Sequence, residues 1–163
     1  MKFSILAVLL GGLMIGTAIA DQNTALITVK VTVNAAPCEI NNNQVIDVDF
    51  GNNVITTDVA KGTSVEKPVN YTLDCTNADQ SKTLVMRISG SGADFDDTVL
   101  KTSITELGVK LKAGGVDYPL NTDLALASSA SKPALTALLV QQPGSRLPTG
   151  GFTAGATMTV DYQ

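Results

Sequence analysis

The most constraining feature of this sequence is a strict alternation of residue character near its carboxyl end. Between Gly150 and Gln163, every second residue is apolar, and the residues in between are polar or small. A period of two is the signature of a β-strand with one buried face. The sequence therefore predicts a strand over residues 152–162, with these apolar positions: Phe152, Ala154, Ala156, Met158, Val160 and Tyr162.

A second segment with the same period lies far away in the sequence, at residues 25–33. Its β-branched residues favour a strand. Pro37 follows it, and proline cannot donate a hydrogen bond to a β-ladder. We therefore expect residues 21–36 to form an extension apart from a domain over residues 37–163. The apolar face of the extension consists of Ala25, Ile27, Val29, Val31 and Val33.

The sequence between these two segments is typical of an all-β domain. Short apolar segments separated by turn-forming residues predict strands at residues 45–51, 65–75, 83–89, 107–111, 116–120 and 134–141. Gly114 and Gly115 predict a hairpin between two of them. No segment has a convincing helical period, so the fold predicted is an immunoglobulin-like β-sandwich. Since tryptophan is absent and aromatic residues are few, its core must be mainly aliphatic.

The amino-terminal segment has the three parts of a secretory signal peptide. Lys2 precedes an uncharged apolar run, which ends in small residues at Ala18 and Ala20. A membrane anchor is the alternative, but the strongly apolar part, residues 5–15, is shorter than the roughly 20 residues that span a bilayer. We therefore expect residues 1–20 to be a signal peptide and the mature chain to be exported without a membrane span.

The only cysteines are Cys38 and Cys75. An even pair in an exported chain predicts one disulfide, and closing this loop is worth roughly 4 kcal/mol in the chain-entropy description. A metal or redox site is a poor alternative, because the chain has no histidine and the two thiols lack a C-x-x-C spacing.

Residues that could carry catalysis are scarce. Without histidine there is no Ser-His-Asp or Cys-His arrangement, and no glycine-rich phosphate loop precedes a helix. Asp94, Asp96 and Asp97 lack the remaining spacing of a calcium loop, so a solvated loop is the simpler interpretation. A net charge of −4 gives no support for nucleic-acid binding. We expect no enzyme activity, no cofactor and no metal.

The two regular segments allow two interpretations. They could be the first and last strands of a closed sandwich. Alternatively, the sandwich lacks one strand, and a partner strand fills the resulting apolar groove while pairing with its open edge. Residues 25–33 would then fill the groove of a neighbour, with a gross stabilisation on the order of 7–10 kcal/mol before entropy losses.

Taken together, these features resemble pilin subunits of the chaperone–usher class, in particular the minor, tip-associated subunits of P and type 1 pili. The resemblance covers the whole expected mature chain. It rests on the penultimate Tyr162, on Gly150 fourteenth from the end, and on the alternation between them. It also rests on the cysteine pair, the strand ending in Gly51 and the extension before Cys38.

The resemblance implies an incomplete immunoglobulin-like fold that lacks its final strand. A periplasmic chaperone would lend that strand and bind beside residues 152–163. At the outer-membrane usher, the extension of a neighbouring pilin subunit would replace it, and the chain would reach the cell surface in a fimbrium. The groove strand implied by the resemblance comprises Gly150, Phe152, Ala154, Ala156, Met158, Val160, Tyr162 and Gln163, with Met158, Val160 and Tyr162 lining the groove.

One position departs from the family pattern, and the place in the fibre stays open. Many family extensions carry a glycine where this chain has Val31, so either the register is shifted or the acceptor groove is deeper there. The implied function is a minor tip adaptor that contributes to adhesion, with a major rod pilin or a terminator as alternatives. A tip adhesin would need a further receptor-binding domain. A self-contained secreted binding domain is the alternative outside the family.

Overall fold

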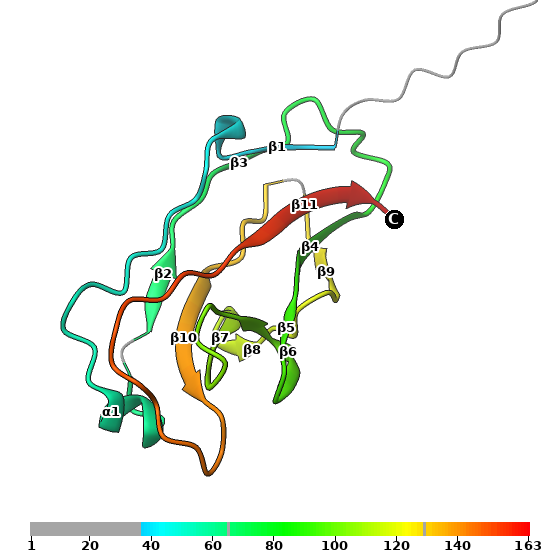
Figure 1. Cartoon of the computed structure of the whole chain (residues 1–163). Coiled ribbons are helices and arrows are strands. Elements are labelled where there is room, and N and C mark those ends of the chain that lie inside the picture. The colour runs from blue at the N-terminus through cyan, green and yellow to red at the C-terminus, as the bar shows by residue number, and fades with distance from the viewer. Residues whose placement is uncertain (1–36, 65, 129) are drawn as a thin grey trace, which may run out of the picture. The chain divides into compact units, whose positions relative to one another are not determined.

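The computed structural model describes residues 37–64, 66–128 and 130–163 (Figure 1). The expected signal peptide and the expected extension over residues 21–36 lie outside the described residues, so both stay predictions.

The described part of the chain is almost entirely β-structure. Besides a 3₁₀ turn, η1 (Asn41–Asn43), and one short helix, α1 (Thr56–Ala60), it contains eleven strands. They are β1 (Glu39–Ile40), β2 (Lys67–Val69), β3 (Leu73–Asp74), β4 (Leu84–Gly90), β5 (Gly92–Ala93), β6 (Asp96–Lys101), β7 (Leu107–Ala113), β8 (Val116–Asp117), β9 (Asp123–Leu126), β10 (Leu135–Gln141) and β11 (Ala156–Tyr162).

Two antiparallel sheets enclose the core. One has the order β2-β10-β7-β6-β5, with β8 beside β7, and the other has the order β11-β4-β9; a short β1-β3 pair completes the pairing (Figure 1). The alternating residues of β4, β7 and β10 face each other between the sheets. The largest fully buried side chains are those of Met86, Leu139 and Val99. The predicted all-β sandwich with a mainly aliphatic core is confirmed.

Several predicted details are confirmed and others are wrong. The hairpin is present: Ala113 pairs with Val116, and Gly114 and Gly115 take the positive φ values of 59° and 83° that this tight turn requires. The strand predicted at residues 65–75 is broken into β2 and β3. The strand predicted at residues 116–120 is limited to β8. Strands β1, β5, β6 and β9 and helix α1 were not predicted, since their short apolar runs show no clear period.

The predicted disulfide is confirmed. The sulfur atoms of Cys38 and Cys75 are bonded at 2.05 Å. The bond ties the start of β1 to the end of β3, and Cys75 is buried in the core.

Tyr71, between β2 and β3, is buried with its hydroxyl donating to the carbonyl of Pro133 (2.7 Å). Burial, with a smaller contribution from Tyr118, raises the pKa of Tyr71 from 10.0 to about 12. Well below pH 10, the phenol of Tyr71 is protonated in both the folded and the unfolded chain. Between these two pKa values the unfolded chain releases this proton while the folded chain keeps it, so the free energy of unfolding falls as pH rises.

We therefore expect Tyr71→Phe to reduce the alkaline loss of stability. The variant should be less stable than the parent at pH 8, because it lacks the hydrogen bond to Pro133. Between pH 8 and pH 11 this difference should shrink by about 1.4 kcal/mol. Urea unfolding of both proteins at the two pH values measures it. A constant difference would show that the phenol of Tyr71 titrates normally.

Candidate functional site

A large groove of about 1210 Å³ opens over the core of the described domain. Two segments contribute most of its lining, and we call them the first groove segment (residues 43–54) and the second groove segment (residues 147–158). In Figure 1 the first runs in cyan from η1 to α1, and the second leads in orange and red into β11. Further lining comes from core side chains of both sheets: Ile88, Leu100, Leu107, Val109, Leu111, Ala137 and Leu139.

The first groove segment has the period of a strand but no strand partner. Ile46, Val48 and Phe50 are half-buried and pack against the core, while the residues between them are exposed. None of the described strands pairs with this segment, so the strand predicted at residues 45–51 is wrong as a paired strand. Pairing between β1 and β3 ends at Ile40, after which the residues of η1 take positive φ values of 49–58°.

The second groove segment ends in the first half of β11. This strand pairs with β4 along its whole length, and no other described strand pairs with it. The strand predicted from residue 152 therefore begins later, at Ala156. Before that point, the chain is attached to the two residues that follow β6. The contacts are a single bridge between Ala154 and Thr102 and two hydrogen bonds between Thr153 and Ser103. Gly150, Gly151 and Gly155 supply no side chains that could pack this stretch against a sheet.

The structure separates the predicted groove residues into two groups. One group lines the groove: Gly150, Phe152, Ala154, Ala156 and Met158. The other group, at the far end of β11, does not: Val160, Tyr162 and Gln163.

The residues of the second group have other contacts. Val160 is only 5 % exposed and belongs to the core. The hydroxyl of Tyr162 accepts a hydrogen bond from the backbone of Asp79 (2.8 Å), and the ammonium group of Lys82 lies 4.9 Å from its ring centroid. The backbone N–H of Gln163 donates to Thr83 (2.9 Å). The expectation that Val160 and Tyr162 line the groove is therefore not met, because Val160 is buried in the core and Tyr162 contacts the loop before β4.

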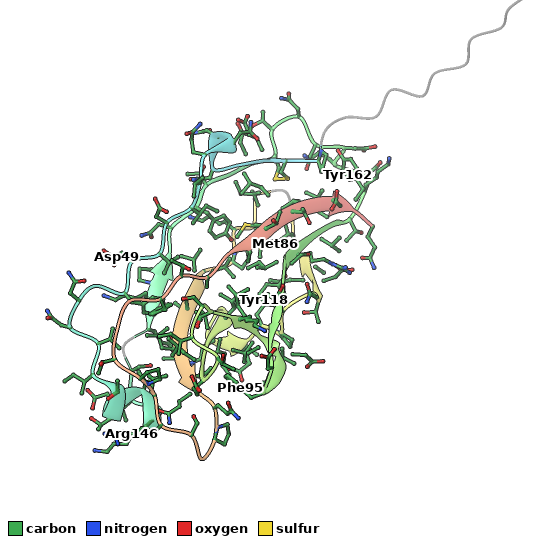
Figure 2. All side chains as sticks on the ribbon, in the orientation of Figure 1. Asp49, Met86, Phe95, Tyr118, Arg146 and Tyr162 are labelled. Atoms are coloured by element: carbon green, nitrogen blue, oxygen red, sulfur yellow. A yellow bond between two sulfur atoms is a disulfide. The ribbon has the colours of Figure 1, made fainter. Side chains whose placement is uncertain are left out.

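The groove offers apolar surface and backbone groups rather than reactive side chains. Asp47 and Asp49 lie on its first segment, and both are exposed. Figure 2 shows Asp49 at the outer side of this segment. A short strand laid between the two segments could bury alternate side chains in the groove. Its backbone could pair with the open edge of β11. No proton transfer or nucleophilic chemistry follows from this set of residues.

Other candidate sites in the described chain are weaker. Asp94 forms an ion pair with Lys101 (2.6 Å), and hydrogen bonds from Thr98 lower the pKa of Asp96. Among the residues that the structure describes, no three potential metal ligands lie together. The described helices are also too short and too polar to cross a membrane.

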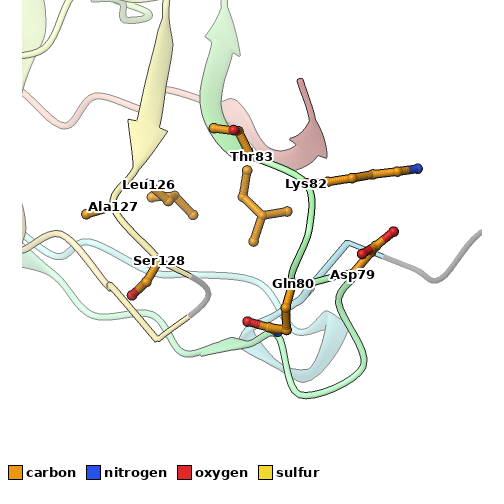
Figure 3. Close-up of a pocket in the computed structure, with 8 residues that line it drawn as sticks. Asp79, Gln80, Lys82, Thr83, Leu126, Ala127 and Ser128 are labelled. Atoms are coloured by element: carbon orange, nitrogen blue, oxygen red, sulfur yellow. The ribbon is translucent and has the colours of Figure 1, made fainter.

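A small pocket of about 240 Å³ lies where β4, β9 and the loop before β4 meet (Figure 3). Lys82 points away from Leu126 and Ser128 in this view, and Asp79 caps the backbone and hydroxyl of Ser81. The pocket thus has no convergent charged groups.

Comparison with known proteins gives consistent results. The family model described as "Fimbrial protein" matches residues 27–163. The uncharacterized fimbrial-like protein YfcR of Escherichia coli is 33 % identical over 156 residues, covering 90 % of this chain and 86 % of that protein. The minor fimbrial protein PrsF of Escherichia coli is 28 % identical over 159 residues, covering 90 % and 92 %.

Solved pilus subunits have a similar fold. The P pilus rod subunit PapA has a TM-score of 0.62 at 21 % identity and covers 85 % of this chain and 100 % of its own. The P pilus adaptor subunit PapF has a TM-score of 0.57 at 26 % identity and covers 81 % and 100 %.

Proposed function

The chain belongs to the fimbrial protein family, and on this premise we propose that it polymerises by exchange of strands between subunits. It is a structural component of a surface fimbrium rather than an enzyme, and its fold is the immunoglobulin-like fold of pilins. In the proposed mechanism, the groove accepts an extended strand from a neighbouring subunit. The chain's own residues 25–33 fill the groove of another subunit.

The observation that carries this proposal is the open groove. Its first segment alternates like a strand without a partner, and β4 is the only strand paired with β11, both statements holding for the described strands. An apolar groove beside an unpaired strand edge is a liability for a protein exposed to water. An inserted strand removes that liability, because it buries the apolar lining and pairs with the edge of β11.

Residues 25–33 have the chemistry of such an inserted strand. Their apolar face alternates at the spacing that fits one side of a strand, and the opposite face consists of Leu26, Thr28, Lys30 and Thr32. We propose that a periplasmic chaperone first lends a strand to the groove and that the outer-membrane usher is the place of exchange. Both partners follow from the family resemblance.

Within the fibre, we propose the position of a minor tip adaptor that contributes to adhesion. Identity to the P pilus adaptor PapF exceeds identity to the rod subunit PapA, and a minor fimbrial protein is among the relatives. A rod pilin or a terminator would use the same groove. Copy number in sheared fimbriae separates these positions, since a rod subunit dominates the fibre by mass.

The groove is tested by the binding of a synthetic donor strand. Peptides with the sequence of residues 22–35, and of the corresponding segments of other subunits of the same fimbria, are added to the mature chain. We expect at least one peptide to raise the melting temperature, because a ligand at 100 times its Kd stabilises a protein by about 2.7 kcal/mol. Differential scanning calorimetry measures this shift.

A matched pair of variants on β11 controls for non-specific effects. Ala156→Asp introduces a carboxylate at a position that lines the groove, whereas Thr159→Asp introduces one at a position of the same strand that does not. An unpaired carboxylate buried by the peptide costs several kcal/mol, so the first variant should lose the shift and the second should keep it. A monomer that is stable alone and indifferent to every peptide would support a self-contained domain instead.

A further inference from the structure

Two phenylalanines from the two groove segments meet at the groove. Phe50 belongs to the first segment and Phe152 to the second. Their ring centroids are 6.0 Å apart, and the ring planes are inclined by 50°. Tilted aromatic pairs at this separation attract each other beyond simple burial. The pair therefore joins the two segments between which a donor strand would have to lie.

Little else joins the segments to a sheet near these rings. The first segment has no strand partner among the described strands, and the second is attached before β11 by the bridge from Ala154 to Thr102 and by hydrogen bonds to Ser103. Both rings are half-buried and pack on the core. Separating them would break an aromatic contact without breaking a ladder of backbone hydrogen bonds.

Each phenylalanine also lies close to a glycine with a positive φ. Gly51 follows Phe50 with a φ of 76°, and Gly150 precedes Phe152 by two residues with a φ of 138°. Apart from the glycine itself and its two chain neighbours, no heavy atom lies within 4 Å of the position that a Cβ would occupy at either glycine. Glycine changes its backbone angles with less steric restriction than other residues, so both rings are attached next to points where the chain can turn.

We propose that Phe50 and Phe152 form an aromatic clasp that must open before a donor strand can enter the groove, and that this step limits the rate of strand insertion. This inference rests on the proposed function, because it concerns the same groove. The clasp holds the groove segments together while the groove is empty. It delays insertion without adding to the affinity of the final complex, since the rings are parted once the strand is in place.

The test measures the association rate of a fluorescein-labelled donor peptide by stopped-flow anisotropy. The variants are Phe50→Leu, Phe152→Leu and the combination of both, which keep an apolar side chain but remove the ring pair. We expect each single variant to raise the association rate about 2- to 10-fold, the range that corresponds to the loss of one aromatic pair. The combined variant should be no faster than the faster single one, because either change opens the clasp.

Two matched controls separate the clasp from a general loss of packing. Phe152→Tyr keeps the ring pair and should keep the rate of the parent protein. Phe95→Leu makes the same change at a residue outside the groove lining (Figure 2), and it should also leave the rate unchanged. An increase in the Tyr variant equal to that in the Leu variant would overturn the clasp.

The two proposals fail in different ways. If the peptide binds with its usual affinity while all variants associate at the rate of the parent, the clasp is refuted and strand acceptance stands. If no donor peptide binds the parent or any variant, strand acceptance is refuted and the clasp with it. The melting temperature of each variant is measured before the kinetics, so that any variant that does not fold is identified. If one single variant fails to fold, the association rate of the other single variant, compared with its control, tests the clasp.

Discussion

A chain that lacks residues 21–34 should fail to incorporate into the fibre at any position where it must donate a strand to another subunit. Under the proposed mechanism, this chain keeps the groove and should still accept a strand, but it has no strand to donate. The expected loss is essentially complete, since the five apolar side chains of the donor face would contribute on the order of 7–10 kcal/mol of gross stabilisation. Cells that produce only the truncated chain are compared with parent cells by immunoblotting of sheared fimbriae.

A pair of point variants tests the same idea without shortening the chain. Val29→Asp places a charge on the apolar face of the extension, and Thr28→Asp places one on the opposite face. Since strand residues alternate between faces, the first variant should fail to incorporate and the second should incorporate normally. Normal incorporation of the truncated chain would refute residues 25–33 as the donor.

Removing the disulfide should cost the domain more stability than the loss of a single side-chain hydrogen bond such as that of Tyr71. Replacing Cys38 and Cys75 by alanine opens a loop with a sequence separation of 37 residues. The chain-entropy description gives about 4 kcal/mol for such a loop, and measured losses of native disulfides are typically 2–5 kcal/mol. Urea unfolding of the oxidised protein and of the double variant measures the difference.

The disulfide should also affect the groove. The loop that it closes contains the whole first groove segment and α1, so opening it leaves this side of the groove less constrained. We expect weaker binding of donor peptide together with the loss of stability. A reducing agent should destabilise the parent protein by the same amount and leave the double variant unchanged. A loss below about 1 kcal/mol would mean that the β1–β3 pair holds the loop closed without the bond.

The sequence alone was sufficient wherever local pattern decides the structure. Alternation along β4, β7 and the second half of β11 determines which side chains face the core, because successive residues of a strand point to opposite faces. Two glycines determine the hairpin after β7, because the turn requires positive φ values. The cysteine pair determined the one covalent link. The absence of histidine removed most catalytic arrangements.

Only the tertiary structure decided which alternating segments have partners. Residues 45–51 and residues 107–111 both alternate, yet the first borders an open groove and the second lies in the middle of a sheet. Periodicity cannot separate them, because pairing depends on a neighbour that is distant in sequence. The same reason explains why Met158 lines the groove while Val160, two residues further on the same face, is covered. The contact between Phe50 and Phe152 likewise depends on two chain segments that only the folded domain brings together.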